Sequence, residues 1–475
     1  MRTRKQRSVI YLVSGVAALA GLLFGFDTGI ISGALLYIQR DFVLTTEAKE
    51  LVVSTVLLGA MFGSLLSGRL TDRFGRRRSM LVISSLFILG TLISSFATNI
   101  AAIIVGRLFL GVSIGVGCYT APLYIAEAAP VELRGGLVSF NQLAITIGIM
   151  VSYFITYYFT GTECSWRWMF AIGLIPAILL SLGMMFLPES PRWLVKQGQK
   201  EKAIEVLKYL RGTSSVEHEV NEIEQSLNVR KARFFEVFSP WVRPVLLLGF
   251  MLGFLQQATG VSTIIYYAPT IFQVAGHSVA QSTLMTAGLG IVNVIATIFA
   301  VLFIDKFGRR PLLLVGLVGM GVALMGLSFV FSAGVDSNVL QWSAVFCTFS
   351  YMICFAFSLG AILWLLVSEI FPLEVRGAAM SLSVFSCWFW NFVVSSTFLS
   401  LLNQMGPSNT FLLYAFVCII GLIFCYYKVP ETRGITLEQI EDNIRKGLPL
   451  RALGQPVLGG GPLVQPQPEP SELSS

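Results

Sequence analysis

The chain has 475 residues, of which 55% are hydrophobic and only 12% are charged, and its mean hydropathy is +0.75. A soluble protein is roughly a quarter charged, so these values exclude a soluble globular protein and indicate an integral membrane protein. The formal net charge is +7 at pH 7, a balance that also occurs in nucleic-acid-binding proteins. The distribution of the basic residues, given below, explains this charge without a nucleic acid.

Twelve apolar stretches follow one another along the chain, each long enough to cross a bilayer as a helix, which takes about 20 residues. The predicted fold is therefore an all-α integral membrane protein with twelve transmembrane helices. These spans lie near residues 9–36, 50–70, 79–98, 101–124, 137–159, 168–187, 244–267, 282–304, 311–333, 341–368, 378–402 and 410–427.

Two polar parts of the chain lie outside these spans. The segment 188–243, between the sixth and seventh spans, carries two amphipathic helical patterns, and Ser214 and Glu217 form a capping box that opens the second. The chain end becomes rich in Pro, Gly and Gln after Gly447, and we predict disorder there.

The basic residues lie almost all on one side of the predicted membrane. Of the 33 lysines and arginines, only Arg40, Lys49 and Arg167 fall in loops opposite the N-terminus, and Arg107 falls inside a span. The positive-inside rule therefore predicts that both termini are cytoplasmic. The predicted domains are a cytoplasmic N-terminus (1–8), a first six-helix half (9–187), a cytoplasmic helical linker (188–243), a second six-helix half (244–428) and a cytoplasmic tail (429–475).

Three short motifs occur twice, in the same order. Their copies follow spans 2 and 8, spans 4 and 10, and spans 6 and 12, so the two six-span halves are parallel repeats, an architecture of secondary transporters. The motifs are DRFGRR at 72–77 with DKFGRR at 305–310, EAAPVELRG at 127–135 with EIFPLEVRG at 369–377, and PES at 188–190 with PET at 430–432.

All copies of these motifs fall on the predicted cytoplasmic side. Ordinary positive-inside loops would explain the arginines, but not the acidic residues at matched spacing. We predict that these charges form a cytoplasmic gate, a latch between the halves that pairs in one packing and separates in another. The predicted gate residues are Asp72, Arg76, Glu127, Arg134, Glu189, Arg192, Asp305, Arg309, Glu369, Arg376, Glu431 and Arg433.

The first span contains one aspartate, Asp27, in the apolar run GLLFGFDTGIISG. An ionised carboxylate that faces lipid is costly, so we expect Asp27 to face the protein. Helix rise places Asp27 roughly 20 Å and Arg107 of the fourth span about 10–12 Å from the outer ends of their spans, a gap that helix tilt and a shift of the span ends can close. We predict that these two residues couple transport to a proton, because protonation of Asp27 would release the arginine. A permanent buried ion pair is the alternative.

The same run carries a ridge of glycines. Gly21, Gly25, Gly29 and Gly33 recur at every fourth position and permit the close approach of a neighbouring helix. At about 100° per residue, Asp27 projects roughly opposite this ridge. The ridge is therefore predicted to pack on one helix while the carboxylate faces the interior.

D-[RK]-F-G-R-R in both halves, PESPRWL, QQATG and PETRG together resemble the motifs of the sugar porter family of the major facilitator superfamily. The resemblance extends from about residue 8 to about residue 447, with the motifs in the family's order. The likeness is to bacterial proton-coupled symporters of galactose, arabinose and xylose, with inositol–proton symporters nearby. It implies two six-helix halves with the sugar bound between them at the membrane midplane.

The resemblance also implies the substrate-binding residues. Side-chain amides donate and accept hydrogen bonds without charge, which suits sugar hydroxyls, and aromatic faces cover the C–H faces of the ring. The residues alone leave interhelical hydrogen bonding of the amides and lipid-facing packing of the tryptophans open. The implied residues are Phe24, Gln142, Gln256, Gln257, Ser262, Tyr266, Tyr267, Asn293, Trp364, Trp388 and Asn391, of which Phe24, Tyr266 and Tyr267 line the cavity or its outer gate.

Three positions depart from the family's pattern. Ser262 stands where QQ-x-x-G-x-N has asparagine, Ala361 stands where span 10 usually has proline, and Cys387 precedes Trp388 where an amide is common. These departures affect the identity of the substrate rather than the family, so the choice among hexose, pentose and cyclitol stays open.

The sequence contains no GxxxxGK[ST] loop and no cluster of nucleophile, base and oxyanion donors, so we expect neither ATP-driven transport nor an enzyme. The predicted function is proton-coupled symport of a monosaccharide by alternating access. The resemblance adds that proton-coupled members carry Asp at position 27, where facilitative members commonly carry Asn. The alternatives are a proton–myo-inositol symporter, a facilitative sugar uniporter and a non-transporting sugar sensor.

The expected partners are a monosaccharide, a proton and membrane lipid, without a nucleic acid or a cofactor. The seven cysteines are odd in number and mostly lie in apolar segments, which argues against a secreted disulfide framework. His218 and His277 are far apart, so we expect no metal site and place both on exposed loops or surface helices. The expected location is a bacterial inner membrane; the oligomeric state is open, with a monomer as the expectation.

Overall fold

The computed structural model describes residues 4–162, 165–212, 216–227, 234–335, 337–372 and 374–455. Within these ranges, twelve helical segments are long and apolar enough to cross a membrane, as the sequence predicted. They are built from α1 (Arg4–Asp41), α2 (Thr46–Phe74), α3 (Arg76–Ser95), α4 (Ile100–Ala128), α5 (Val131–Tyr158), α6 (Ser165–Ala171), α7 (Leu174–Phe186), α11 (Arg243–Ala258), α12 (Val261–Val274), α13 (Val279–Phe307), α14 (Arg309–Ala333), α15 (Asn338–Phe357), α16 (Leu359–Ile370), α17 (Arg376–Ser395) and α18 (Phe398–Lys428).

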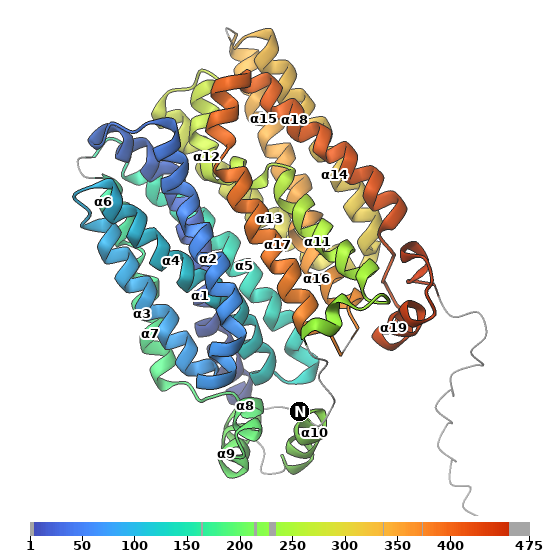
Figure 1. The fold of residues 1–475 in the computed structure, drawn as a ribbon. Helices are drawn as coiled ribbons and strands as arrows, with labels where there is room; N and C mark the ends of the chain where they lie inside the picture. Colours follow the sequence, from blue (N-terminus) through green and yellow to red (C-terminus); the bar gives the residue numbers. More distant parts are fainter. Residues whose placement is uncertain are drawn as a thin grey trace, which may run out of the picture.

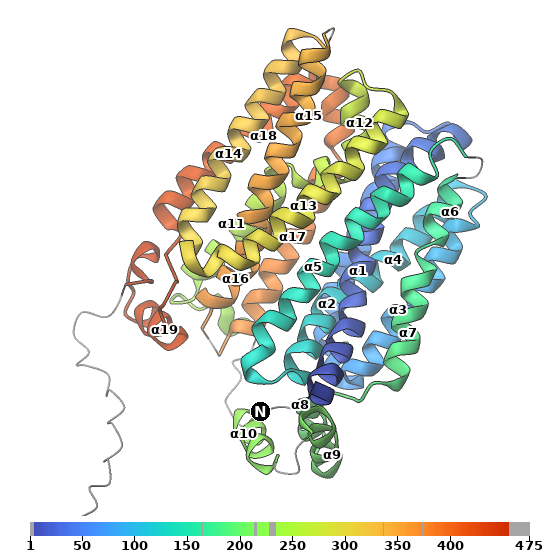
Figure 2. The ribbon, with the colours of Figure 1, turned by 180° about the vertical axis from the view of Figure 1, so that it is seen from behind.

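The membrane helices form two bundles that lie side by side. In the first bundle, α2 packs on α4 and α1 packs on α5, and in the second bundle α14 packs on α18 and α11 on α17. Figures 1 and 2 show the two bundles from opposite views, the first in blue to green and the second in yellow to red. This is the two-half, all-helical fold that the internal repeat predicted.

Short helices outside the bundles gather at one end of the molecule. The segment between the bundles forms α8 (Pro191–Lys196), α9 (Lys200–Arg211) and α10 (Glu217–Leu227), and the chain end forms α19 (Leu437–Arg445). Figure 1 shows these helices at the same end as the N-terminus, and we call this end the terminal side and the other end the far side. The predicted Ser214 cap lies outside the described residues.

Several membrane spans are interrupted. Gly260 adopts φ +94°, a left-handed conformation suited to glycine, and separates α11 from α12. Within α12 the helix is kinked at Tyr267, two residues before Pro269. The sequence missed a similar break in α18, where Gly406 has φ +78° and Pro407 follows. The break at Gly260 brings Gln256 and Gln257, near the end of α11, close to Ser262 at the start of α12, and all three side chains are buried.

The last two predicted spans have different bounds in the structure. The expected span 378–402 runs past the end of α17 at Ser395, and α18 begins at Phe398 rather than near residue 410. Hydropathy does not detect this turn because it holds only the three small polar residues Ser395, Ser396 and Thr397, between apolar runs that include the buried Phe398. At the chain end, Leu453 is buried and Asn443 donates to its carbonyl oxygen at 2.9 Å. Ordered chain therefore continues past Gly447, as far as residue 455.

The glycine ridge of α1 packs on α5. A Cβ atom on Gly25 would lie 1.9 Å from the carbonyl oxygen of Ile145, and equivalent atoms on the other ridge glycines would also clash with α5. The predicted close helix contact is therefore present, and its partner is α5. This contact holds α1 in a fixed rotation, with its opposite face turned toward α4.

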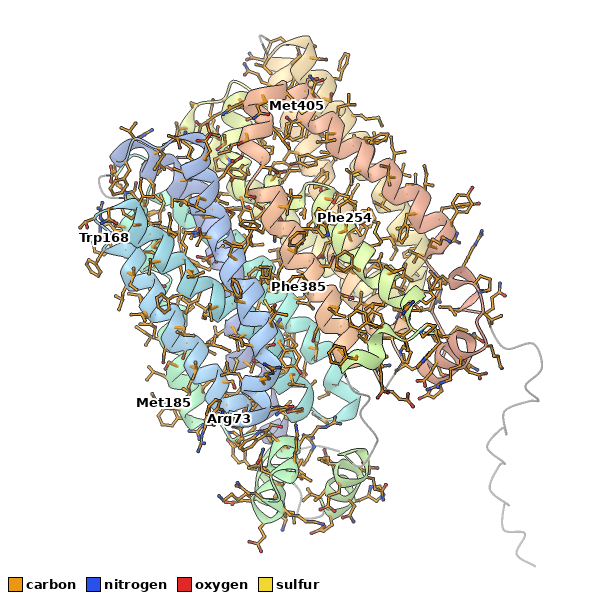
Figure 3. The ribbon with its side chains drawn as sticks, in the orientation of Figure 1. Arg73, Trp168, Met185, Phe254, Phe385 and Met405 are labelled. Atoms are coloured by element: carbon orange, nitrogen blue, oxygen red, sulfur yellow. The ribbon has the colours of Figure 1, made fainter. Side chains whose placement is uncertain are left out.

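Large apolar side chains cover the outside of both bundles. Trp168 and Met185 of the first bundle are 59% and 52% exposed, and Met405 of the second is 44% exposed. Figure 3 shows Trp168 and Met185 pointing away from the bundle. Such surfaces are expected where a helix faces lipid.

The two bundles meet through α5 and α13, α2 and α17, and α1 and α12. Several hydrogen bonds cross between the bundles toward the far side. Glu50 of α2 accepts bonds of 2.7 Å from both the backbone N–H and the hydroxyl of Ser400. Tyr153 of α5 donates to the carbonyl oxygen of Ile265 at 2.8 Å, and further bonds join Thr160 to Thr283 and Asn403 to Thr46.

Candidate functional site

Asp27 and Arg107 form the predicted ion pair inside the first bundle. Arg107 Nη1 lies 3.4 Å from Asp27 Oδ1, and the two side chains are 0% and 2% exposed, respectively. Arg107 also donates to the backbone carbonyl of Val53 on α2 at 3.3 Å. The second carboxylate oxygen of Asp27, Oδ2, has no hydrogen-bond partner among the described residues. The pair is therefore buried, and Asp27 Oδ2 keeps its lone pairs available to accept a proton.

The implied amide residues gather in the second bundle, at the break between α11 and α12. Gln256 and Gln257 close α11, and Ser262 opens α12. The Ser262 hydroxyl donates to Gln257 Oε1 at 2.6 Å, and Gln257 Nε2 lies 3.1 Å from the sulfur of Cys387 on α17. All four side chains are buried. Two of the three departures from the family's pattern thus contact the same glutamine.

Aromatic side chains bring the two bundles together beside these amides. Phe24 of α1 and Trp388 of α17 have ring centroids 5.5 Å apart. Tyr266 of α12 is 2% exposed, and the side chains of Thr28 on α1 and Asn391 on α17 lie next to its hydroxyl. Since Thr28 follows Asp27 in the chain, the ion pair and the amide cluster are neighbours across the boundary between the bundles.

The remaining implied substrate residues come from other helices. Asn293 of α13 is buried, whereas Gln142 of α5 and Trp364 of α16 are partly buried. Tyr267 donates to the carbonyl oxygen of Ser395 at 3.0 Å, at the kink of α12. Contact of these residues with a substrate stays a prediction.

At the terminal side, the motif residues of the first bundle form one network. Arg76 Nη2 donates to Glu127 Oε1 at 2.9 Å, and the Ser190 hydroxyl donates to the other oxygen of the same carboxylate. Glu189 Oε1 accepts from the backbone N–H groups of Arg76 and Arg77 at 2.8 and 3.0 Å. A carboxylate in this position satisfies the free N–H groups at the start of α3 and interacts favourably with its dipole.

The second bundle repeats this network with the second copies of the motifs. Arg309 Nη2 donates to Glu369 Oε1 at 3.0 Å, and the Thr432 hydroxyl donates to the same carboxylate. Glu431 accepts from the backbone N–H groups of Arg309 and Arg310 at 3.1 and 3.0 Å, at the start of α14. The repeated acidic residues therefore have a structural explanation: each copy caps a helix and pairs an arginine.

These ion pairs join residues of the same bundle rather than the two bundles. Asp72 pairs with Lys196 of α8 at 2.9 Å, and Arg376 and Arg433 donate to backbone carbonyls of their own bundle. Arg192 lies on α8. The side chains of Arg134 and Asp305 lie outside the described residues. A latch between the halves, formed by these charges in another conformation, stays a prediction.

The sequence missed three polar residues of these networks. The hydroxyls of Ser190 and Thr432 donate to the carboxylates of Glu127 and Glu369. The sequence indicated these hydroxyls through the repeated motifs PES and PET, which have Ser or Thr at the same position. Glu50 is 4% exposed and bridges the bundles at the far side. Its only signal was an acidic residue at the start of an apolar run.

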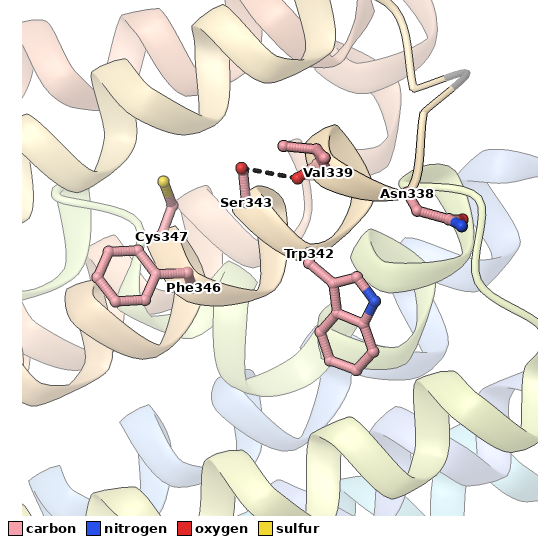
Figure 4. A pocket seen from close by; sticks show the side chains of 6 residues that line it. All are labelled: Asn338, Val339, Trp342, Ser343, Phe346 and Cys347. Atoms are coloured by element: carbon pink, nitrogen blue, oxygen red, sulfur yellow. Dashed lines mark hydrogen bonds between the residues drawn. The ribbon is translucent and has the colours of Figure 1, made fainter.

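A shallow pocket lies on the outer face of α15, away from these residues. It is lined by Asn338, Val339, Trp342, Ser343, Phe346 and Cys347, and Figure 4 shows the rings of Trp342 and Phe346 beside it. Trp342 also contacts His277, with ring centroids 5.7 Å apart. His277 is 8% exposed, so its prediction as an exposed residue was wrong, because this tryptophan covers it.

Comparisons with known proteins agree with this arrangement. The family model described as "Sugar (and other) transporter" matches residues 13–443. The chain is 39% identical over 455 residues to the galactose-proton symporter of Escherichia coli (strain K12), covering 95% of this chain and 98% of that protein. It is 38% identical over 437 residues to the glucose transporter GlcP of Staphylococcus epidermidis, covering 92% and 97%.

The fold is also found in a solved structure. The partially occluded inward open conformation of the xylose transporter XylE from E. coli aligns with a TM-score of 0.80 and 30% sequence identity. The alignment covers 90% of this chain and 100% of that chain.

Proposed function

This chain belongs to the sugar porter family of the major facilitator superfamily, and we propose that within this family it is a proton-coupled symporter of a monosaccharide. Members of the family are transporters rather than enzymes, and the chain is accordingly a monosaccharide transporter. The relatives are named for galactose, glucose and xylose. Proton coupling is the finer part of the proposal.

The observation that carries the proposal is the buried pair of Asp27 and Arg107. The 3.4 Å separation leaves one carboxylate oxygen without a hydrogen-bond partner among the described residues. An ionisable pair inside a membrane bundle is a default candidate for coupling. Tyr266 of the second bundle lies beside the side chain of Thr28, the residue that follows Asp27. The ion pair therefore lies next to a contact between the two bundles.

The proposed cycle uses the two bundles as rigid bodies. Asp27 takes a proton from the far side, and the sugar binds to the amides and aromatic rings between the bundles. Rocking of the bundles then exposes the site to the terminal side, which we propose is cytoplasmic. The bonds of Glu50 and Tyr153 join the bundles at the far side, so in the proposed cycle this arrangement is the one from which the sugar leaves at the terminal side.

The test is Asp27→Asn in proteoliposomes, with D-galactose, D-glucose, D-xylose and myo-inositol as probes. We expect sugar-driven counterflow to continue and uphill accumulation under an inward proton gradient to be lost, because the amide cannot carry the proton. Asp41→Asn is the matched control, since Asp41 lies near the end of the same helix and pairs with Arg167 at 3.3 Å. The control should still accumulate sugar.

Three results would contradict parts of the proposal. Unchanged accumulation by the Asp27→Asn protein would exclude proton coupling through this residue. Downhill flux without proton movement in the wild type would indicate a uniporter, and transport of myo-inositol alone would indicate a cyclitol symporter. No flux of any probe would indicate a sensor.

A further inference from the structure

Five polar groups at the junction of α11, α12, α16 and α17 form one continuous chain of hydrogen bonds. The Ser262 hydroxyl bonds to Gln257, Gln257 bonds to both Cys387 and Gln256, and Cys387 bonds to Gln256. Gln256 Nε2 then donates to the backbone carbonyl of Leu359 at 3.2 Å. We call this chain the glutamine relay.

The orientation of both amides in the relay follows from its last bond. The carbonyl of Leu359 can only accept, so the nitrogen of Gln256 must face it, and the oxygen of Gln256 must face the other members. That oxygen can only accept, so Gln257 turns its nitrogen toward Gln256, at 3.4 Å, and its oxygen toward Ser262. One backbone carbonyl thus fixes the direction of the relay.

Cys387 lies between the two glutamine amides of the relay. Its thiol donates to Gln256 Oε1 at 2.9 Å and its sulfur accepts from Gln257 Nε2 at 3.1 Å. A hydroxyl has the same pattern of one donor and acceptor lone pairs, but it forms stronger hydrogen bonds than a thiol. Cys387 is buried and directly precedes Trp388, whose ring contacts Phe24 of the first bundle. The thiol is therefore a weak stand-in for a hydroxyl, next to the boundary between the bundles.

We propose that Cys387 is a specificity-determining residue that occupies, as a weak internal competitor, the place between the two glutamine amides that one hydroxyl of the sugar takes. This inference rests on the proposed function. On binding, that hydroxyl donates to Gln256 Oε1 and accepts from Gln257 Nε2, and it replaces both bonds of the thiol. Within the site, the two weak hydrogen bonds of the thiol are replaced by two stronger hydrogen bonds of the sugar hydroxyl. The relay thereby selects substrates that carry a hydroxyl at this place on the ring.

Ser262 supports the same selection from the other end of the relay. Its hydroxyl occupies Gln257 Oε1 at 2.6 Å, so this oxygen is held away from the substrate. Gln257 is left to offer its nitrogen, and Gln256 its oxygen. A single hydroxyl can donate to Gln256 Oε1 and accept from Gln257 Nε2. A protonated amine has only donors, so it cannot accept from Gln257.

The test compares Cys387→Ala with Cys387→Ser, using D-glucose and its set of monodeoxy analogues, or the matching D-galactose or D-xylose series if the wild type prefers it. The alanine variant removes the internal competitor, so we expect KM for the complete sugar to fall about threefold. The serine variant strengthens the competitor, so we expect KM to rise about fivefold. The one analogue that lacks the exchanged hydroxyl should show no change in either variant.

Cys347→Ser is the matched control, because Cys347 lies on the outer face of α15 and contacts no member of the relay. A purely structural role of Cys387 would change KM for all analogues by the same factor, and this result would overturn the inference. A shift in the same direction for alanine and serine would also overturn it. Absence of uptake by the wild type would overturn both this inference and the proposed function.

Discussion

The two ends of this transporter are held together in different ways. At the terminal side, the ion pairs Arg76–Glu127 and Arg309–Glu369 each join helices of one bundle. At the far side, the bonds of Glu50 to Ser400 and of Tyr153 to Ile265 join one bundle to the other. The bundles can therefore separate at the terminal side without breaking these ion pairs, whereas opening of the far side must break the bonds between them.

This difference separates two properties that a transporter needs. The pairs within a bundle contribute to its rigidity, because each joins helices that move together. The bonds across the boundary contribute to the balance between conformations, because they exist only while the far side is closed. Substitutions at the two ends should therefore have different signatures: one should lower the stability of the fold and the other should shift a population.

The largest effect is expected from Glu127→Gln. Glu127 and Arg76 are 5% and 7% exposed, and removal of one charge of a buried pair costs about 3 kcal/mol, because Arg76 then keeps only its longer pair with the exposed Asp72, at 3.6 Å. Thermal unfolding in detergent should show this loss, with little bias toward either conformation. Glu222→Gln is the control, since its side chain is 62% exposed. Equal melting temperatures for the two variants would contradict the structural role of the pair.

A smaller effect on stability but a clear shift in population is expected from Glu50→Gln. The variant loses two charge-assisted bonds to Ser400 at the start of α18, each 2.7 Å long, and such bonds are worth about 1.5–3 kcal/mol. The population open at the far side should rise by about tenfold or more. Distances between spin labels at Val43 and Val339, which are 100% and 76% exposed, measure this shift.

Ser400→Ala provides the graded control for Glu50. It removes the hydroxyl donor but keeps the backbone N–H donor, so its shift in the label distances should be smaller than that of Glu50→Gln. An unchanged distance distribution in the Glu50→Gln protein would show that this contact does not affect the balance between conformations.

The parts of the site that the sequence predicted are those with few alternatives. Asp27 and Arg107 are the two ionisable residues deepest in the spans, and burial in a membrane leaves such groups little choice of partner. The glycine ridge was predictable for a related reason, because a spacing of four residues on a helix always forms one face. The internal repeat likewise placed corresponding acidic and basic residues at the same positions in the two halves, although the predicted use was a latch between the halves.

Contacts between distant segments could not be predicted from patterns. Glu50 and Ser400 are separated by 350 positions in the chain, and nothing near Glu50 specifies a serine as its partner. The repeat showed that acidic and basic residues correspond, but not that each arginine pairs within its own bundle. The glutamine relay depends on how α11 and α12 bend at Gly260, which brings Ser262 back to Gln257. Such geometry follows from packing and is absent from residue spacing.

The smallest effect on the boundary is expected from Tyr153→Phe. The carbonyl of Ile265 would normally accept from the backbone N–H four residues later, but residue 269 is a proline and has no N–H. Tyr153, which is 1% exposed, supplies the missing donor from the other bundle at 2.8 Å. One neutral hydrogen bond is worth about 1 kcal/mol, so the population open at the far side should rise about fivefold.

The same proline offers a way to test this explanation. In the double variant Tyr153→Phe with Pro269→Ala, the alanine N–H can bond to the Ile265 carbonyl, so the loss of the tyrosine hydroxyl should have less effect than it has alone. Tyr158→Phe is the control, because that side chain is 78% exposed near the end of the same helix. Equal effects of Tyr153→Phe with and without Pro269 would mean that the hydroxyl acts on something other than the carbonyl that the proline leaves unpaired.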